Sequence, residues 1–384
     1  MPRIVLLGAT GYTGSRVLAR LAARSDVPVT LVGRSAQRLR EQARSAAADC
    51  QIIEADTTAP GVLDGVLEAD DIVISTVGPF VDLGREVVRS VARAGAVYLD
   101  SAGEPPFIEW VFRALSGQAD ATGALLVPGF GYDFVPGHVA GWLAAEAGGQ
   151  HTDSIDIGYY LWRHSPGAAR PYRQPSFSEM TRVTTPGTRE SLAKVVAEPS
   201  FAYRANQADR FGLESRRSAA GLLRFNLAGR DRPAITIGGS EHLGLPEVLP
   251  HIRRVDVGLG WFGPASVPIF YGSRFGGALM TSTAARKATR AIAARLPYPN
   301  RMPDLPARTS VIARAYGRHG NTLAEVTVDG PGPYEFTADI LARTAHYLAD
   351  GHEYRGGVHG PLAALGSQQL VDVAGDSGLT VNPG

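Results

Sequence analysis

Short apolar runs alternate with amphipathic stretches over the first 130 residues. The stretches Arg16–Ala23 and Arg85–Ala94 carry apolar positions at helical spacing. The runs between such stretches are rich in leucine or β-branched residues and nearly continuous, which is typical of strands buried on both faces of a sheet; they are Ile4–Leu7, Val29–Val32, Gln51–Glu54, Ile72–Thr76, Val97–Leu99 and Leu125–Val127. Strands that alternate with helices at this spacing predict βαβ units and a parallel sheet.

The pattern changes after about residue 137. Residues 155–161 and Val311–Ala315 alternate between apolar and other positions with a period of two, which is typical of half-buried strands. Arg318–Asn321 contains a glycine and an asparagine and precedes the apolar-rich stretch Leu323–Val328. This arrangement predicts an antiparallel hairpin. We therefore expect a second domain that contains a mixed or antiparallel sheet.

A glycine-rich turn follows the first predicted strand. In the order Gly8-Ala-Thr-Gly11-Tyr-Thr-Gly14, the first glycine permits a tight turn, the second lets the backbone approach a pyrophosphate, and the third allows close packing of helix on strand. The start of the next helix offers free N–H groups to the phosphates. A purely structural turn is the alternative, but the position after the first strand favours dinucleotide binding. The predicted phosphate-binding residues are Gly8, Thr10, Gly11, Tyr12, Thr13 and Gly14.

The end of the second strand indicates which dinucleotide binds. Arg34 stands where an NAD-dependent enzyme places an acidic residue on the ribose hydroxyls. A guanidinium group binds a 2′-phosphate through charge-assisted hydrogen bonds. Ser35 offers a further donor and Arg38 lies one turn on. A solvated loop arginine is the alternative, but the absence of the acid favours NADPH over NADH.

Two further strand ends carry candidate cofactor residues, because ligands of parallel sheets bind at the carboxyl ends of strands. Asp56 and Thr57 end the third run and are expected to border the adenine or, alternatively, to cap a helix. The turn after the fourth run is expected to pass beneath the nicotinamide ribose; its candidate residues are Ser75, Thr76, Val77, Gly78 and Phe80.

Candidate catalytic residues follow the fifth and sixth strands. Asp100 and Glu104 end the fifth, and Tyr132 and Asp133 follow the sixth. We expect Tyr132 or Asp133 to lie nearest the atom that accepts the hydride, with Asp100 or Glu104 behind. Loop capping and domain packing are the alternative roles of these carboxylates.

Charge and cysteine content narrow the function classes. Lysine and arginine number 38 against 37 aspartate and glutamate, so the formal net charge is +1 and no overall field attracts nucleic acid. Residues 163–232 hold 13 basic and six acidic residues with interleaved aromatics. A nucleic-acid groove and a solvated face are the two interpretations, and the overall neutrality favours the second. Cys50 is the single cysteine, which fits a reducing cytoplasm and leaves no cysteine pair for a disulfide.

Several classes of site are not expected. Only Lys194 and Lys287 are lysines, and neither follows a tyrosine by four residues, so the tyrosine–lysine pair of short-chain dehydrogenases is missing. No spacing of histidine, cysteine or carboxylate residues predicts a metal site, and His138 and His242 are weak catalytic candidates. No segment predicts a membrane-spanning helix.

Val257–Ser273 carries no charge and contains six glycines and prolines. These residues disfavour a regular helix, so we expect a loop or a broken element. An apolar surface loop of this kind either covers an apolar substrate or packs into a dimer interface. We expect Phe262 and Phe270 to approach the nicotinamide end of a cleft in the first case.

Five further motifs carry a resemblance to a known family. After the glycine-rich turn come Val77-Gly-Pro-Phe80, Tyr98–Glu104 and Gly129–Pro136, and near the C-terminus Pro333–Ala338 and Gly356–Pro361. In this order the motifs resemble the saccharopine dehydrogenase-like NADPH-dependent reductases, which include trans-acting enoyl reductases. Where those reductases tend to have Gly-Phe-Asp-Ser-x-Pro, this chain has Gly131-Tyr-Asp-Phe-Val-Pro136. Residues 150–310 match no motif of the family, so the substrate stays open.

The resemblance implies an α/β fold in which a Rossmann-type parallel sheet carries an inserted second α+β domain. We expect an NADP-binding Rossmann domain at 1–137, completed by residues 352–384, and a substrate and dimerisation domain at 138–351. We predict an NADPH-dependent reductase that transfers hydride to an activated C=C, C=O or C=N bond of an apolar metabolite, of polyketide or lipid origin in secondary metabolism. The alternatives are a saccharopine-like imine reductase acting on an amino-acid-derived substrate and a non-catalytic NADPH sensor. A homodimer is expected.

Overall fold

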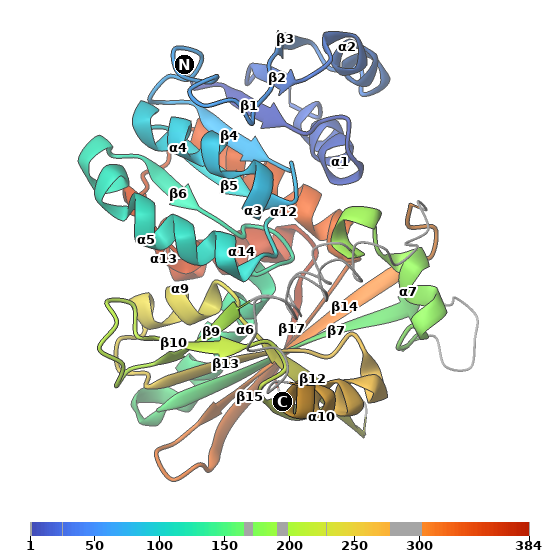
Figure 1. The fold of residues 1–384 in the computed structure, drawn as a ribbon, viewed down its shortest axis with the longest axis vertical. Coiled ribbons are helices and arrows are strands. Elements are labelled where there is room, and N and C mark those ends of the chain that lie inside the picture. The colour runs from blue at the N-terminus through green and yellow to red at the C-terminus, as the bar shows by residue number, and fades with distance from the viewer. Residues whose placement is uncertain are drawn as a thin grey trace. The chain divides into compact units, whose positions relative to one another are not determined.

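The computed structural model describes residues 2–24, 26–164, 172–189, 199–227, 229–276 and 302–383 (Figure 1). The chain divides into two compact units. The first unit comprises Met1–Val135 and Pro333–Gly378, and the second comprises Pro136–Gly332 and Leu379–Gly384. The second unit is therefore inserted into the first, and each is described by itself below.

The first unit is built on a seven-stranded parallel sheet in the order β16-β6-β5-β4-β1-β2-β3. Its central strands are buried on both faces, as the continuous apolar runs predict. The predicted Rossmann-type sheet is confirmed. Its strands are β1 Ile4–Leu7, β2 Val29–Gly33, β3 Cys50–Glu54, β4 Ile72–Ser75, β5 Val97–Asp100, β6 Leu125–Val127 and β16 Gly357–Val358.

Helices join these strands, and glycines end two of them. Gly95 and Gly123 follow α4 and α5 with φ of 75° and 77°, a left-handed conformation that glycine adopts without steric cost. Pro105 opens α5 at a position where a missing N–H breaks no helical hydrogen bond. The helices of this unit are α1 Tyr12–Leu21, α2 Ala36–Ser45, α3 Phe80–Leu83, α4 Arg85–Ala94, α5 Pro105–Thr122, α12 Pro333–Ala349, α13 Pro361–Leu365 and α14 Ser367–Asp376.

The C-terminal part of the chain returns to the first unit earlier than predicted. We expected the return at residue 352, but α12 already packs on α1. The ion pairs Arg16–Glu335 and Arg20–Asp339 join the two helices, and Arg24–Asp350 lies just beyond their ends. The C-terminal end of the predicted Rossmann domain, at residue 384, also differs, because β17 (Thr380–Pro383) pairs with β15 of the second sheet. The sequence did not reveal the ion pairs between α1 and α12, because alternating charges are also common on helix faces that contact only solvent.

The second unit contains a mixed ten-stranded sheet whose main path is β10-β9-β13-β7-β14-β15-β17. Its one parallel pair among the described strands is β13 with β7. The predicted hairpin is confirmed, with Val311 opposite Val328. The strands are β7 Ser154–His164, β8 Tyr172–Arg173, β9 Pro199–Arg204, β10 Leu213–Arg217, β11 Leu222–Leu227, β12 Arg230–Ile237, β13 Arg254–Leu259, β14 Ala307–Tyr316, β15 Thr322–Gly330 and β17.

Opposite faces of this sheet pack against different elements. Ile157 on one face lies against α6, where a Cβ on Gly141 would come within 3.2 Å of the Ile157 side chain. Tyr160 and Trp162 on the other face form a core cluster with residues of the β11–β12 hairpin. The helices of the unit are α6 Val135–Gly148, α7 Phe177–Val183, α9 Glu241–Val248 and α10 Ser266–Gly276, with short 3-10 turns at Gly149–His151 and Gly263–Ala265.

The uncharged stretch Val257–Ser273 is not a loop. It contains the end of β13, a turn, and most of α10. Pro268 is the third residue of α10, in the first turn, where a helix has no N–H partner to lose. The expectation of a loop without regular helix was wrong, although the stretch is broken between a strand and a helix. The effect of a proline depends on its position within a helix, and the sequence does not show where the helix begins.

Candidate functional site

The turn between β1 and α1 has the geometry that a pyrophosphate site requires. Gly8 has φ of +85°, and the N–H of Gly11 donates to its carbonyl at 2.8 Å. A Cβ on Gly14 would lie 2.1 Å from that same carbonyl oxygen, so only glycine fits there. No side chain caps the N-terminus of α1, where Gly11 is the N-cap residue. The first N–H groups of α1 are therefore available to an anion.

Thr76 and Tyr12 hold this turn from two sides. The Thr76 hydroxyl donates to the Leu7 carbonyl at 3.0 Å, and a Cβ on Gly8 would lie 2.5 Å from its oxygen. The guanidinium of Arg16 lies 3.6 Å from the centre of the Tyr12 ring, and Tyr334 packs edge-on against that ring at 5.0 Å. Thr10 lies within the turn itself, and Thr13 lies in the first turn of α1.

The predicted 2′-phosphate site lies at the end of β2. Arg34 and Arg38 are both exposed, so their guanidinium groups are accessible to a ligand. Ser35 caps α2, because its hydroxyl accepts from the N–H of Arg38 at 3.4 Å. Asp56 accepts hydrogen bonds from the main chain and hydroxyl of Thr58, which lower the pKa of its carboxyl. Asp56 thus stabilises a turn and does not cap a helix, because β4 is the next element after β3, and the neighbouring Thr57 is buried.

The turn after β4 begins with the buried Ser75 and continues through Val77 and Gly78. The ring of Phe80 is also buried and packs against Phe107 at 5.6 Å, so it belongs to the core of the unit.

Glu104 and Asp100 organise neighbouring loops. The Glu104 carboxylate accepts from the N–H groups of Phe80 and Val81, both at 3.0 Å, and so caps the start of α3. Asp100 accepts from the N–H groups of Gly129 and Ala102 at 2.7 and 2.9 Å. Burial raises the pKa of Asp100 to about 6, although these hydrogen bonds favour its ionised form.

Tyr132 and Asp133 lie in the segment after β6. Tyr132 is buried, and its N–H donates to the Thr337 hydroxyl at 3.0 Å. Asp133 is partly exposed and lies against Gly103, where a Cβ would come within 2.6 Å of the carboxylate. Loss of hydration raises the pKa of Asp133 to about 6. The loops after β5 and β6 therefore meet within one unit, through Asp133 against Gly103 and through Asp100 bonded to the main chain of Gly129.

Thr337 is a positioning residue that reasoning from the sequence missed. It belongs to α12 and lies 205 residues from Tyr132 along the chain. Its hydroxyl donates to the Pro333 carbonyl at 2.7 Å while it accepts from Tyr132. The one available signal was the motif Pro333–Ala338, which we used only as a sign of resemblance.

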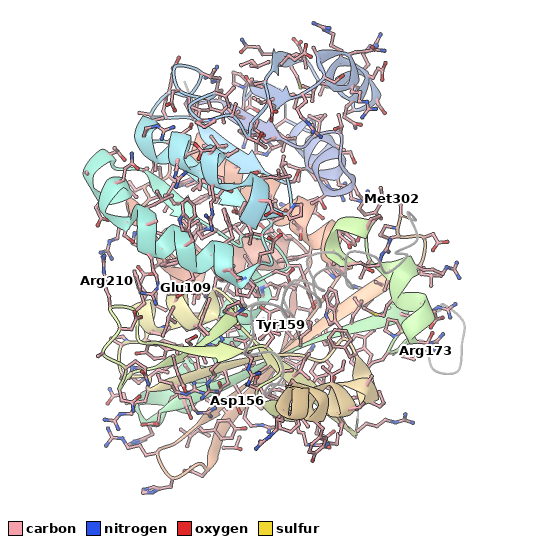
Figure 2. The ribbon with its side chains drawn as sticks, viewed as in Figure 1. Glu109, Asp156, Tyr159, Arg173, Arg210 and Met302 are labelled. Carbon is pink, nitrogen blue, oxygen red and sulfur yellow. The ribbon has the colours of Figure 1, made fainter. Side chains whose placement is uncertain are left out.

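The second unit contains a buried polar cluster where α6 and α9 begin. The Tyr159 hydroxyl donates to Glu241 at 2.5 Å and accepts from the N–H of Gly137 at 3.0 Å (Figure 2 labels Tyr159). The ring of His138 lies 3.0 Å from the Ser240 hydroxyl. Burial lowers the pKa of His138 to about 3 and that of His242 to about 4, so both imidazoles are neutral near pH 7. Neither histidine is placed to donate a proton as imidazolium.

The described residues hold no cluster of three or more histidine, cysteine or carboxylate side chains of the kind that binds a metal ion. Within the same part of the chain, no helix is long and apolar enough to cross a membrane.

The glycine turn, the parallel sheet and the basic end of β2 define the first unit as a dinucleotide-binding Rossmann unit. Residues 4–127 match the family model of the saccharopine dehydrogenase NADP binding domain. This match confirms the predicted resemblance and the NADP cofactor for this part of the chain.

Two relatives match this chain over part of their own length. Trans-acting enoyl reductases of Mycobacterium leprae and Mycobacterium ulcerans are 36% and 35% identical over 137 residues. Each match covers 35% of this chain and 33% of the relative. The saccharopine dehydrogenase (L-Glu forming) of Saccharomyces cerevisiae aligns over 100% of this chain and 99% of its own, with a TM-score of 0.61 and 14% identity. At this identity the alignment shows that the two chains share a fold.

Proposed function

We propose that the protein is an NADPH-dependent reductase of an activated carbon–carbon double bond in an apolar metabolite. The observation that carries the proposal is the phosphate-binding turn Gly8–Gly14 in a segment that matches an NADP-binding domain. The exposed Arg34 after β2 supports NADPH over NADH. The names of the mycobacterial relatives favour an enoyl substrate.

The reaction adds one hydride and one proton across the double bond. When bound, NADPH supplies the hydride. The main chain of the Gly8–Gly14 turn would hold the pyrophosphate, and Arg34 would hold the 2′-phosphate. We propose Asp133 as the proton donor, because it is partly exposed and its pKa of about 6 leaves roughly a tenth of the carboxyl groups protonated at pH 7.

The other candidates act indirectly in this proposal. Asp100 and Glu104 hold the loops through main-chain hydrogen bonds. The N–H of Tyr132 bonds to Thr337, and its ring is buried. These residues would position Asp133 rather than exchange protons with the substrate.

NADPH oxidation followed at 340 nm with three kinds of substrate tests the proposal. A 2-enoyl thioester, a ketone and a cyclic imine of similar size separate C=C, C=O and C=N reduction. The enoyl thioester is expected to be turned over fastest. Preferred turnover of the imine would support a saccharopine-like reaction, and tight NADPH binding without any turnover would support a sensor.

We further propose that the protein forms a homodimer through α10. Tyr271 of this helix is 54% exposed, and it lies beside the partly exposed Phe270 in an uncharged stretch. Sedimentation of the purified chain should give a dimer, and Tyr271→Asp should give a monomer. A native chain that sediments as a monomer at micromolar concentration contradicts this assignment.

A further inference from the structure

A group of three polar atoms in the first unit is buried without a hydrogen-bond partner of normal geometry among the described residues. The atoms are the hydroxyl oxygens of Ser75 and Tyr98 and the Oδ2 oxygen of Asp100. All three side chains are fully buried. A buried polar atom normally has a partner, so these three atoms are available to one another.

The parallel sheet places these three side chains on one face. Ser75 of β4 is paired with Asp100 of β5, and paired residues of neighbouring strands point their side chains to the same side. Tyr98 precedes Asp100 by two residues on the same strand, and side chains two residues apart share a face. The two hydroxyl groups and the carboxylate therefore belong to one face at the carboxyl ends of β4 and β5.

The electrostatic effects among the three groups give a direction to their interaction. Burial raises the pKa of the Tyr98 hydroxyl well above its usual value, and the Asp100 carboxylate raises it further, so Tyr98 stays protonated and can donate. Hydrogen bonding with Ser75 lowers the pKa of Tyr98 in part. Burial also raises the pKa of Asp100, whereas hydrogen bonding with Tyr98 lowers it. Ser75 is thus a donor toward Tyr98, and Tyr98 is a donor toward Asp100.

The ionised form of Asp100 is the form that holds the neighbouring loops. One carboxylate oxygen accepts from the N–H groups of Gly129 and Ala102 at 2.7 and 2.9 Å. Gly129 belongs to the segment after β6 that also carries Asp133. Burial and the Glu104 carboxylate both raise the pKa of Asp100, so they act against the ionised form. A donor at Oδ2 favours that form, because Oδ2 accepts none of the main-chain hydrogen bonds.

We propose that Tyr98 is a positioning residue of the reductase site. Its hydroxyl, supported by Ser75, donates to Oδ2 of Asp100 and keeps the carboxylate ionised near neutral pH. The carboxylate then holds Gly129, and with it the segment that carries Asp133. A hydrogen bond to an ionised acceptor is roughly twice as strong as one between neutral groups, so the chain of donors favours the charged form. The role in reduction rests on the proposed function of Asp133, whereas the chain of hydrogen bonds does not.

Denaturant titration of the full chain with Tyr98→Phe, at pH 5 and at pH 8, tests the chain of hydrogen bonds. Because the pKa of Asp100 is about 6, its carboxyl is mostly protonated in the folded protein at pH 5 and ionised at pH 8. Tyr98→Phe removes a donor to the ionised form, so the variant should be destabilised chiefly at pH 8. There the unfolding equilibrium constant should rise roughly 10- to 100-fold, and at pH 5 it should change far less.

Ser75→Ala is a second variant that keeps the tyrosine ring in place. Ser75 acts on Asp100 through Tyr98, so this variant should show the same pH dependence with a smaller size. In an Asp100→Asn background, Tyr98→Phe should destabilise the protein equally at both pH values, because no carboxylate remains to be ionised.

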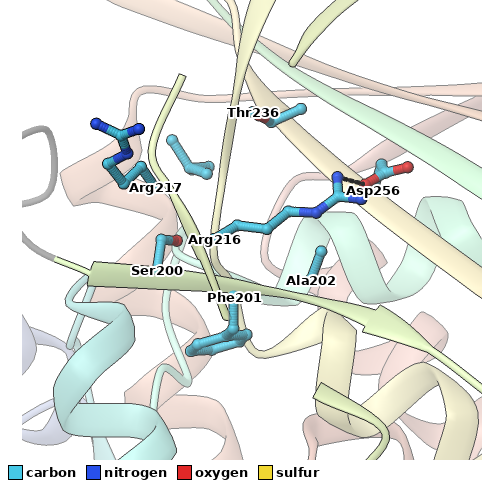
Figure 3. Close-up of a pocket in the computed structure, with 8 residues that line it drawn as sticks. Ser200, Phe201, Ala202, Arg216, Arg217, Thr236 and Asp256 are labelled. Atoms are coloured by element: carbon cyan, nitrogen blue, oxygen red, sulfur yellow. Dashed lines mark ion pairs between the residues drawn. The ribbon is translucent and has the colours of Figure 1, made fainter. Parts of the chain in front are cut away.

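Ser200→Ala is the matched serine control. The Ser200 hydroxyl is also buried without a hydrogen-bond partner among the described residues, but Ser200 lines a hollow of about 10 Å³ beside β9 and β13, which has room for about one water (Figure 3). Its effect should be the same at pH 5 and pH 8. The proposal is overturned if Tyr98→Phe destabilises the protein equally at both pH values, or if its pH dependence persists in the Asp100→Asn background. No substrate is used, so failure of the reductase proposal leaves this result unaffected.

Discussion

At the scale of single residues, steric limits restrict which residues can occupy the turn Gly8–Gly14 more strictly than charge does. A side chain at Gly14 would collide with the Gly8 carbonyl within the same turn, and a side chain at Gly8 would meet Thr76. Such collisions are independent of solvent and salt. The choice between NADPH and NADH depends instead on Arg34, an exposed group whose contribution is electrostatic.

Arg34→Asp is therefore expected to change cofactor choice without unfolding the protein. The substitution removes the guanidinium and adds a carboxylate that repels a 2′-phosphate. One charge-assisted hydrogen bond contributes about 1.5–3 kcal/mol, so NADPH affinity should fall roughly 10- to 100-fold relative to NADH. Fluorescence titration of both cofactors against both proteins measures the ratio. Arg40→Asp, at an exposed arginine within α2, is the control. An unchanged NADPH/NADH ratio in Arg34→Asp would remove the basis of the assignment.

The raised pKa of Asp133 predicts a pH profile. A proton donor must be protonated, so kcat should decrease as pH rises through about 6, by up to tenfold per unit. Asp100 has a similar pKa, and the variant Asp133→Asn separates the two groups. It should lower kcat about 10²- to 10⁴-fold and abolish the profile while NADPH affinity is kept. A kcat that is constant between pH 5.5 and 8 excludes Asp133 as the donor.

At the scale of elements, α12 connects two loops of the first unit that are far apart in sequence. Its Tyr334 packs against Tyr12 of the phosphate turn, and its Thr337 binds the main chain of Tyr132. The helix thus fixes the phosphate turn and the segment that holds Asp133 relative to each other.

Thr337→Val tests this coupling with little change of shape. The variant leaves the buried N–H of Tyr132 without its partner, which should cost about 1–3 kcal/mol of unfolding free energy in denaturant titrations. The kcat should decrease more than the NADPH affinity, because the Asp133 segment is displaced and the phosphate turn is not. Thr344→Val in the same helix is the control, since the buried Thr344 hydroxyl has no hydrogen-bond partner among the described residues. Equal effects of the two variants would mean that Thr337 only fills space.

The sequence predicted the strands of the first unit better than those of the second, and the reason is physical. Strands of the first unit are buried on both faces, so their apolar runs marked β1 to β6 to within one residue at most ends. In the second unit, Arg204 of β9 pairs with Asp256 and Glu214 across the sheet, which hides the apolar alternation. The glycine turn is local and was predicted. Thr337 and the Tyr159–Glu241 pair depend on long-range contacts, and the sequence did not indicate them.

At the scale of the whole molecule, the chain crosses between the two units three times, near residues 135, 332 and 378. The C-terminal segment therefore serves both units. Before the last crossing it adds β16 beside β6, where the N–H groups of Gly357 and His359 donate to Ala124 and Leu126. After the last crossing it adds β17 to the second sheet.

Two truncations separate these contributions. A chain that ends at Gly378 loses only β17 and should keep native NADPH affinity, because the first unit is intact. A chain that ends at Asp350 also loses β16, α13 and α14, with the buried Leu362, Leu370 and Val373. Each such side chain contributes about 1.5–3 kcal/mol on burial, so the loss is comparable with the total stability of roughly 5–15 kcal/mol. We expect this shorter chain to melt at a much lower temperature and to bind NADPH weakly, as thermal unfolding and fluorescence titration would show. If it instead binds NADPH as the native chain does, the last 34 residues contribute nothing to the Rossmann unit and the single-unit assignment of 333–378 fails.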